Sequence, residues 1–178
     1  MTGSIYDATV PQFLDRLVQM VALIDKAQDH CAANGIAPAE LLGARLADDM
    51  WHLSLQFKSC WSHSADAVDS ALSGKRDVDY AEPPADFGYL RQRLADAIAR
   101  LQAITPGDLE RVRDGTVKIS AGEHRLEFTV PDYLVRFALP NFYFHCSIAF
   151  AILRNRGLRI GKGDFLGAMP LKGGEHLK

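Results

Sequence analysis

Cysteine is scarce in this chain, and its spacing excludes two kinds of stabilising site. The 178 residues include three cysteines, Cys31, Cys60 and Cys146, which lie far apart in the sequence. An odd number of widely spaced cysteines does not make a disulfide framework, and no CxxC pair is present to hold structural zinc. We expect each thiol to behave as a small buried hydrophobic side chain.

Long apolar runs and an excess of positive charge are also missing. No apolar stretch reaches the roughly 18 to 20 residues that cross a bilayer, and the N-terminal sequence MTGSIYDATV lacks a basic segment followed by an apolar one. The formal net charge is −2, and Lys and Arg are scattered among Asp and Glu, so no basic face is available for nucleic acid. We therefore expect a soluble, cytoplasmic protein that binds neither membranes nor nucleic acid.

Motifs that identify a reaction are absent as well. The sequence has no glycine-rich phosphate loop after a strand, no GxSxG and no HExxH, and the Gly161-Lys162-Gly163 segment lacks Walker spacing. Any function must therefore be inferred from the fold and from isolated polar residues.

The length allows one well-filled core and is too short for two ordinary domains, so we predict a single domain over residues 1–178. Apolar residues at three-four spacing predict four long helices. These helices cover residues 4–33, 48–72, 86–104 and 133–156. The first begins either at a Thr9-x-x-Gln12 capping box or, one or two turns earlier, at Ser4-x-x-Asp7.

The segments between these helices are shorter. Residues 75–85 are polar with two consecutive prolines and predict a linker. Residues 117–119 and 126–130 alternate apolar and polar positions around a glycine, which predicts a short β-hairpin between helices three and four. After residue 157 glycines are too frequent for a helix, Phe165 and Leu166 are the expected anchors, and about residues 168–178 are expected to be loose.

The predicted fourth helix is apolar on nearly every side, so we expect it to lie at the centre of the core. Its polar residues Asn141 and His145 lie four residues apart and share one face. Pro140 removes a backbone donor and clashes with the preceding turn, which predicts a kink or short break at residues 139–141. Asn141 and His145 therefore mark a candidate pocket.

If residues 48–72 form one uninterrupted helix, a stripe of polar residues lies at the edge of the core. The stripe contains His52, Gln56, Ser59 and His63. His63 has polar neighbours, so we expect it to be exposed to solvent. Trp51 and Leu55 fall on the side away from the core, and two large apolar residues there predict a homodimer interface.

Four segments, SIYDATVPQFLDRL, LLGARLADDM, ALPNFYFHCSIAFAILRNRG and GKGDFLG, resemble in this order an uncharacterised bacterial family of unknown function. The resemblance covers essentially the whole chain, and that family belongs to the DinB/YfiT-like superfamily. It implies an all-α, DinB-like up-down-down-up four-helix bundle, frequent homodimers and, in many members, a divalent metal held by three histidines. Some of these relatives transfer small thiols or isomerise thiol adducts.

The metal pattern of the superfamily is one histidine on helix two and a His-x-x-x-His pair on helix four. Carried over to this chain, it matches His52 and His145, whereas the first position of the pair is Asn141. An amide oxygen is a weak, neutral ligand for the zinc or nickel that imidazoles favour. His63 lies about three turns, or roughly 16 Å, from His52 along one helix, so both could not join one tetrahedral site.

Two functions remain open. The first is a protein that binds a small molecule or a partner in a pocket between helices two and four, lined by Asn141, His145, His52 and Gln56, without an intact three-histidine metal site. The second is a divalent-metal-dependent enzyme of the thiol S-transferase or isomerase type, in which His52 and His145 hold zinc or nickel. Purely structural roles also stay open, because His145 can bond to Asn141 inside the core and Asn141 can bond to carbonyls freed by Pro140.

Overall fold

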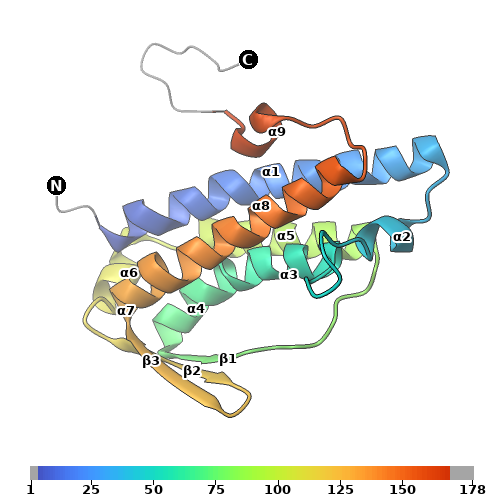
Figure 1. The fold of residues 1–178 in the computed structure, drawn as a ribbon. Helices are drawn as coiled ribbons and strands as arrows, with labels where there is room; N and C mark the ends of the chain where they lie inside the picture. The colour runs from blue at the N-terminus through green and yellow to red at the C-terminus, as the bar shows by residue number, and fades with distance from the viewer. Residues whose placement is uncertain (1–3, 169–178) are drawn as a thin grey trace.

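The computed structural model describes residues 4–168 and is mostly helical, with one small sheet (Figure 1). The helices are α1 (Ile5–Asn34), α2 (Pro38–Leu42), α3 (Leu53–Ser62), α4 (Ala65–Ser73), α5 (Phe87–Gln102), α6 (Pro106–Arg111), α7 (Val130–Asp132), the π-helix η1 (Tyr133–Ala138), α8 (Leu139–Asn155) and α9 (Lys162–Leu166). The strands are β1 (Lys75–Asp77), β2 (Thr116–Ala121) and β3 (His124–Thr129). Apart from Ala168, the tail expected to be loose lies outside the described residues.

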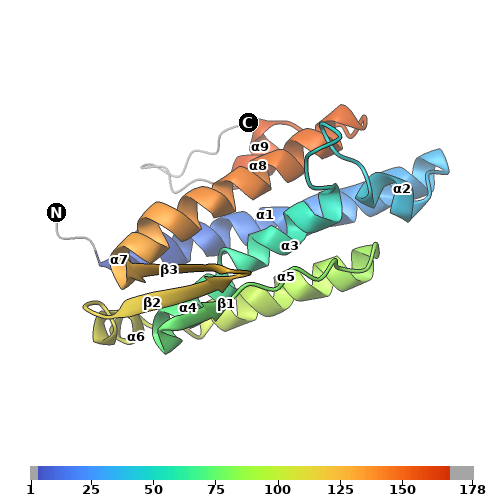
Figure 2. The same ribbon diagram turned by 60° about the horizontal axis from the view of Figure 1, so that its bottom comes forward.

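The long helices lie side by side around one core (Figures 1 and 2). α1 contacts both α5 and α8, and α3 contacts the same two helices from the other side. Large apolar side chains fill the space between them, among them the fully buried Phe13, Phe57, Leu94 and Phe142. Cys31, Cys60 and Cys146 are free and buried, as expected for small hydrophobic residues. No helix within residues 4–168 is long and apolar enough to span a membrane.

α1 begins at the earlier of its two predicted starts. The Ser4 hydroxyl accepts a hydrogen bond from the Asp7 N–H at 3.0 Å, which satisfies one of the free donors at the helix end. Thr9 is not a cap, because its hydroxyl donates to the Ile5 carbonyl oxygen one turn back. The helix ends at Gly35, whose φ of 65° suits glycine.

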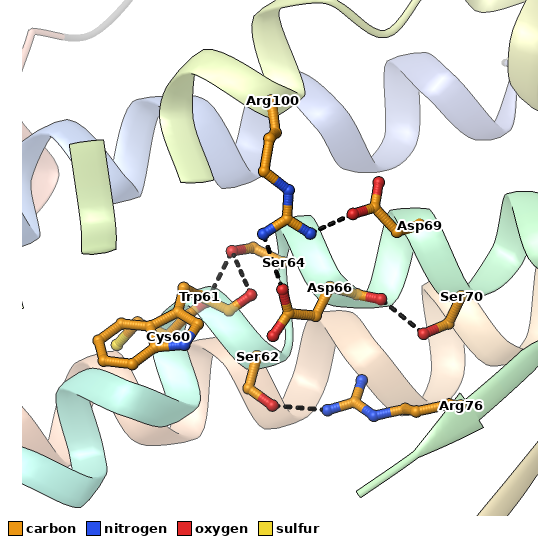
Figure 3. Close-up of polar contacts among 9 residues, drawn as sticks. All are labelled: Cys60, Trp61, Ser62, Ser64, Asp66, Asp69, Ser70, Arg76 and Arg100. Atoms are coloured by element: carbon orange, nitrogen blue, oxygen red, sulfur yellow. Dashed lines mark hydrogen bonds and ion pairs between the residues drawn. The ribbon is translucent and has the colours of Figure 1, made fainter. Parts of the chain in front are cut away.

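The prediction of one helix over residues 48–72 is wrong in two respects. The helix begins only at Leu53, and it is interrupted between α3 and α4 at His63 and Ser64. At the interruption the Ser64 hydroxyl donates to the Cys60 carbonyl oxygen at 2.6 Å (Figure 3). Serine side chains compete in this way with backbone hydrogen bonds, which explains a break that the apolar spacing alone does not reveal.

The predicted linker begins with a strand that was not expected. β1 pairs in parallel with β2, and β2 pairs antiparallel with β3 across a turn that contains Gly122 at φ 59°. β1 consists of three polar residues, so its pairing depends on a strand some 40 residues later rather than on local pattern. The sheet lies against α4 (Figure 2). Phe128 of β3 also packs against Tyr133 and Phe137 of η1.

The last long helix is widened rather than broken near Pro140. The Leu139 N–H bonds to the Leu134 carbonyl oxygen five residues back, which defines the π-helical turn of η1. Regular helix then continues through Pro140 to Asn155. Of the two predicted alternatives, the short break at residues 139–141 is therefore wrong, because a wide turn upstream accommodates the proline ring, and the kink stays a prediction.

The tail also contains a helix that the sequence did not predict. α9 is short and begins where the Asp164 carboxylate accepts the Gly161 N–H at 2.6 Å. This bond offsets the low helix preference of the glycines in the segment. Phe165 in α9 packs against Phe150, with ring centroids 5.7 Å apart.

Candidate functional site

A cavity of about 610 Å³ lies between α3, the η1–α8 helix and the first two strands of the sheet. α3 contributes Leu55 and Ser59 to its wall, and α8 contributes Asn141 and His145. Trp51, in the irregular segment before α3, stands at the mouth with half of its surface exposed. Helices distant in sequence thus place two of the four predicted pocket residues, Asn141 and His145, around one space.

Three aromatic rings are stacked along one side of this cavity. The His145 ring lies between Trp51 and His63, with ring centroids 5.6 Å and 5.5 Å away and planes inclined by 13° and 10°. Phe144 meets the His145 ring edge-on at 5.2 Å, and Phe137 meets His63 at 5.8 Å. The stack shields both imidazoles from bulk water.

Gln56 fixes the orientation and the tautomer of His145. The Gln56 Nε2 donates to the Trp51 carbonyl oxygen at 2.9 Å, so its Oε1 faces His145 and accepts from Nδ1 at 2.8 Å. This arrangement assigns the proton to Nδ1 and leaves the His145 Nε2 lone pair toward the cavity. Gln56 itself is buried behind the cavity wall.

Both imidazoles are neutral at pH 7. Burial lowers the pKa of His145 to about 4. The pKa of His63 is lowered to about 3, first by burial, then by the positive charge of Arg76 and by His145. A neutral imidazole offers a lone pair and a donor but no charge to a ligand.

The prediction that His63 is exposed to solvent is wrong. His63 is half-buried and lines the cavity, and its Nδ1 is buried without a hydrogen-bond partner among residues 4–168. His63 is the C-cap residue of α3, and its ring stacks on that of His145. Sequence reasoning put His63 in a stripe with Gln56 but inferred exposure from its polar neighbours, which give no sign of the rings packed on it.

His52 does not line this cavity, although it was a predicted pocket residue and metal ligand. It precedes α3 as the N-cap residue, and its Nε2 lies 3.7 Å from a Glu82 carboxylate oxygen. Asn141 does line the cavity, and its Nδ2 donates to the Phe137 carbonyl oxygen at 2.7 Å. That bond is a structural role to the backbone, as considered for Asn141, although Phe137 is not the residue four before Pro140, and it leaves the amide oxygen free for a ligand.

Trp51 and Leu55 do not lie on the side away from the core. Both line the cavity, and Trp51 stacks on His145. For Trp51 the expected placement was wrong because Trp51 precedes the first turn of α3 and does not follow its helical winding, whereas Leu55 lies within α3. The homodimer inferred from these residues stays a prediction.

Arg76 is a cavity residue that the sequence did not reveal. It projects from β1 and is 8% exposed. Its Nη1 donates to the Tyr133 hydroxyl at 2.9 Å, and its Nη2 donates to the Ser62 hydroxyl at 2.7 Å (Figure 3). Residues 75–85 looked like an exposed linker, so no sequence pattern indicated a buried guanidinium there.

The residues present do not fit the three-histidine metal centre that the resemblance implies. Within residues 4–168 no group of three or more His, Cys, Asp and Glu side chains is arranged to hold a metal ion. His52 lies outside the cavity that His145 faces, and the remaining position carries the neutral amide of Asn141. Structural and catalytic zinc sites normally use at least three protein ligands.

Comparison with known proteins agrees with this fold. Residues 5–166 match a family described as a domain of unknown function, DUF1993. A solved structure of a DinB family member protein from Shewanella denitrificans is 30% identical, with 94% of each chain covered and a TM-score of 0.78. No curated protein matches the chain significantly. This chain therefore belongs to the DUF1993 family and is a DinB-like protein of uncharacterised function.

Proposed function

We propose that this protein binds a small organic molecule in the cavity between α3 and α8, without a three-histidine metal site. The observation that supports this proposal best is the stack of Trp51, His145 and His63 beside a space of about 610 Å³. Pockets for small molecules are typically about 300 to 1,000 Å³ and combine apolar walls with a few placed polar groups. The cavity has a volume in this range, and its wall combines apolar side chains with a few polar groups.

The polar groups of the wall are suited to orienting a ligand. Gln56 holds the His145 ring so that Nε2 can accept a hydrogen bond, and Asn141 offers an amide oxygen. Trp51 and Phe144 are half exposed at the mouth and present flat apolar faces. A planar organic molecule can pack on these rings while its donors reach the two acceptors.

The alternative, a metal-dependent thiol S-transferase or isomerase using His52 and His145, has less support. His52 contacts Glu82 and does not face the cavity, and a two-histidine set leaves an ion short of protein ligands. We therefore do not derive a reaction through a metal. Elemental analysis of protein purified without a histidine tag tests this part, and stoichiometric zinc or nickel that is lost in His145→Ala would contradict it.

The proposal includes the topology and assembly implied by the resemblance. We assign α1, α3 with α4, α5 and α8 as the four helices of an up-down-down-up bundle. We also propose a homodimer, because Trp51 and Phe144 expose large apolar surfaces near each other at the mouth of the cavity.

Ligand binding is tested with N-phenyl-1-naphthylamine, a neutral fluorescent probe that is excited directly. Wild-type protein should bind it saturably with one site per chain. Leu55→Trp places a bulky ring in the cavity and should weaken binding by roughly tenfold or more, the effect of losing a well-filled apolar contact. Leu126→Trp is the matched control, because Leu126 lies on β3 with its side chain exposed.

Two outcomes would contradict the proposal. The first is the absence of saturable binding to folded wild-type protein. The second is equal binding by Leu55→Trp and Leu126→Trp, which would place the probe outside the cavity. Circular dichroism of both variants establishes that they are folded before their affinities are compared.

A further inference from the structure

We propose that the ligand of this cavity is an organic carboxylate and that Arg76 binds its anionic group at the inner end. The inference rests on the proposed function and adds the chemical class of the ligand. Its foundation is a buried guanidinium whose charge no carboxylate of residues 4–168 neutralises.

Arg76 uses only part of its hydrogen-bonding capacity. A guanidinium has five N–H donors, and the structure shows bonds from two of its nitrogens, to the Tyr133 and Ser62 hydroxyls. Both partners are neutral. In the described part of the chain, no Asp or Glu oxygen lies within ion-pair distance of Arg76, although other arginines such as Arg91 and Arg100 have carboxylate partners.

An uncompensated buried charge is costly, so it needs a reason. A charge removed from water costs several kcal/mol unless an opposite charge or several hydrogen bonds offset the loss. Arg76 is 8% exposed and lines the cavity, so the part that remains accessible faces an interior space. An anion entering that space would supply the missing counter-charge.

The geometry at the inner end matches a carboxylate. The planar guanidinium presents pairs of parallel N–H groups that fit two carboxylate oxygens. The Ser62 hydroxyl accepts from Arg76, so its own proton is free to be donated to the same anion. Arg76 and Ser62 together form a donor set for one oxyanion.

The other charges of the cavity do not repel an anion from this position. Lys58 is engaged by Asp79, whose carboxylate it contacts at 2.8 Å. The side chains of Asp79 and Glu82 are 71% and 73% exposed, so both carboxylates lie at the outer edge in contact with water. His63 and His145 carry no charge at pH 7. The inner end is therefore positive and the outer edge is not.

A second cavity, of about 410 Å³, also contains Arg76 but is less suited to an organic carboxylate. Besides Arg76, four carboxylates and four basic side chains line it, namely Asp66, Asp69, Asp77, Asp79, Lys58, Lys75, Arg93 and Arg100. Arg100 is already paired with Asp66 and Asp69 on that side (Figure 3). The charges of the second cavity therefore largely pair with one another, and Trp61 is its one apolar residue, so we place a ligand with an apolar body in the larger cavity.

The rest of the ligand faces apolar walls. Ile119 and Phe137 lie on the sheet and η1 sides, and Trp51 closes the mouth. These residues favour a flat hydrocarbon or aromatic body over a sugar or a nucleotide. The predicted ligand class is an aromatic or similarly apolar monocarboxylate.

The test compares 2-naphthoate with 2-naphthamide, two probes of nearly equal shape of which only the first is charged. Isothermal titration calorimetry of wild-type protein should show tighter binding of naphthoate by roughly tenfold or more, since hydrogen bonds to a charged group are the stronger ones. Arg76→Gln should remove this preference. Arg76→Lys should keep part of it, because a lysine retains the charge but not the planar pair of donors.

Arg100→Gln is the matched control, because it removes the same charge from the neighbouring cavity without touching the larger one. It should leave the preference for naphthoate unchanged. Loss of the preference in Arg100→Gln and not in Arg76→Gln would place the anion in the second cavity and overturn the inference.

The remaining outcomes separate the two proposals. Equal affinity of wild-type protein for both probes, or no binding of either, would overturn the inference about Arg76, whereas the binding of N-phenyl-1-naphthylamine decides whether the proposed function stands. If Arg76→Gln does not fold, thermal unfolding of wild-type protein tests the inference instead, because a ligand raises the melting temperature according to its affinity. Naphthoate must then raise it more than naphthamide at the same concentration.

Discussion

Lowering the pH from about 7.5 to about 5 should destabilise this protein through two imidazoles. His63 and His145 have pKa values of about 3 and about 4 in the folded protein, below the ordinary value of 6.5. The unfolded chain therefore binds more protons than the folded chain between pH 6.5 and these values. Their contribution to stability is fully present above pH 6.5 and is lost as the pH falls toward 4 and 3.

The magnitude follows from proton linkage. Consider a histidine whose pKa is 6.5 in the unfolded chain and which stays neutral in the folded protein. At pH 5 it lowers the free energy of unfolding by about 2 kcal/mol relative to neutral pH. His63 and His145 together should cost about 4 kcal/mol, a large part of the roughly 5 to 15 kcal/mol of a typical domain. Most carboxylates remain ionised at pH 5, so they add little in this range.

Urea unfolding followed by circular dichroism at the two pH values measures the effect. His63→Phe keeps a flat ring in the stack and should remove about half of the pH-dependent loss. His124→Gln changes an exposed histidine on β3 and should leave the loss as in wild-type protein. An equal pH-dependent loss in His63→Phe and wild-type protein would refute the reasoning, because it would show that His63 is not held neutral by its surroundings.

Three further predictions concern single contacts. Gln56→Leu removes the acceptor of the His145 N–H and should lower the free energy of unfolding, measured in urea, by about 1 to 3 kcal/mol. An unchanged free energy would show that Gln56 does not hold the His145 ring. Gly74→Ala should lower the melting temperature more than Gly35→Ala. Both glycines have positive φ, but only at Gly74 would the new Cβ lie 3.2 Å from a backbone oxygen, that of Thr116 in β2. Trp51→Glu should convert the proposed homodimer into a monomer by light scattering, and an unchanged mass would remove that interface.

The sequence predicted best what depends on local apolar spacing. α1 and α5 begin and end within two residues of the predicted bounds, because buried residues recur along each of them at three-four spacing. Asn141 and His145 stood out because they are polar residues on an otherwise apolar helix, and both line the cavity. An unusual residue in a regular pattern is visible without a structure.

The parts that were missed depend on contacts between distant segments or on side chains that bond to the backbone. β1 forms only because β2 lies beside it, and its buried Arg76 was hidden in a polar linker. His63 was expected in solvent because of its polar neighbours, whereas its ring stacks on His145 and packs against Phe137 from a distant helix. Periodicity contains no information about either effect.

The wide turn of η1 accommodates one surplus residue between Tyr133 and Asn141. A hydrogen bond that spans five residues holds one more residue per turn than regular helix does. Tyr133, which bonds to Arg76, precedes this surplus, whereas Asn141 and His145 follow it. Deleting one residue within η1 would convert the wide turn into a regular helical turn and leave the flanking segments in nearly the same register, so the bond between Tyr133 and Arg76 should survive. What the deletion takes away is the wide turn that accommodates the ring of Pro140.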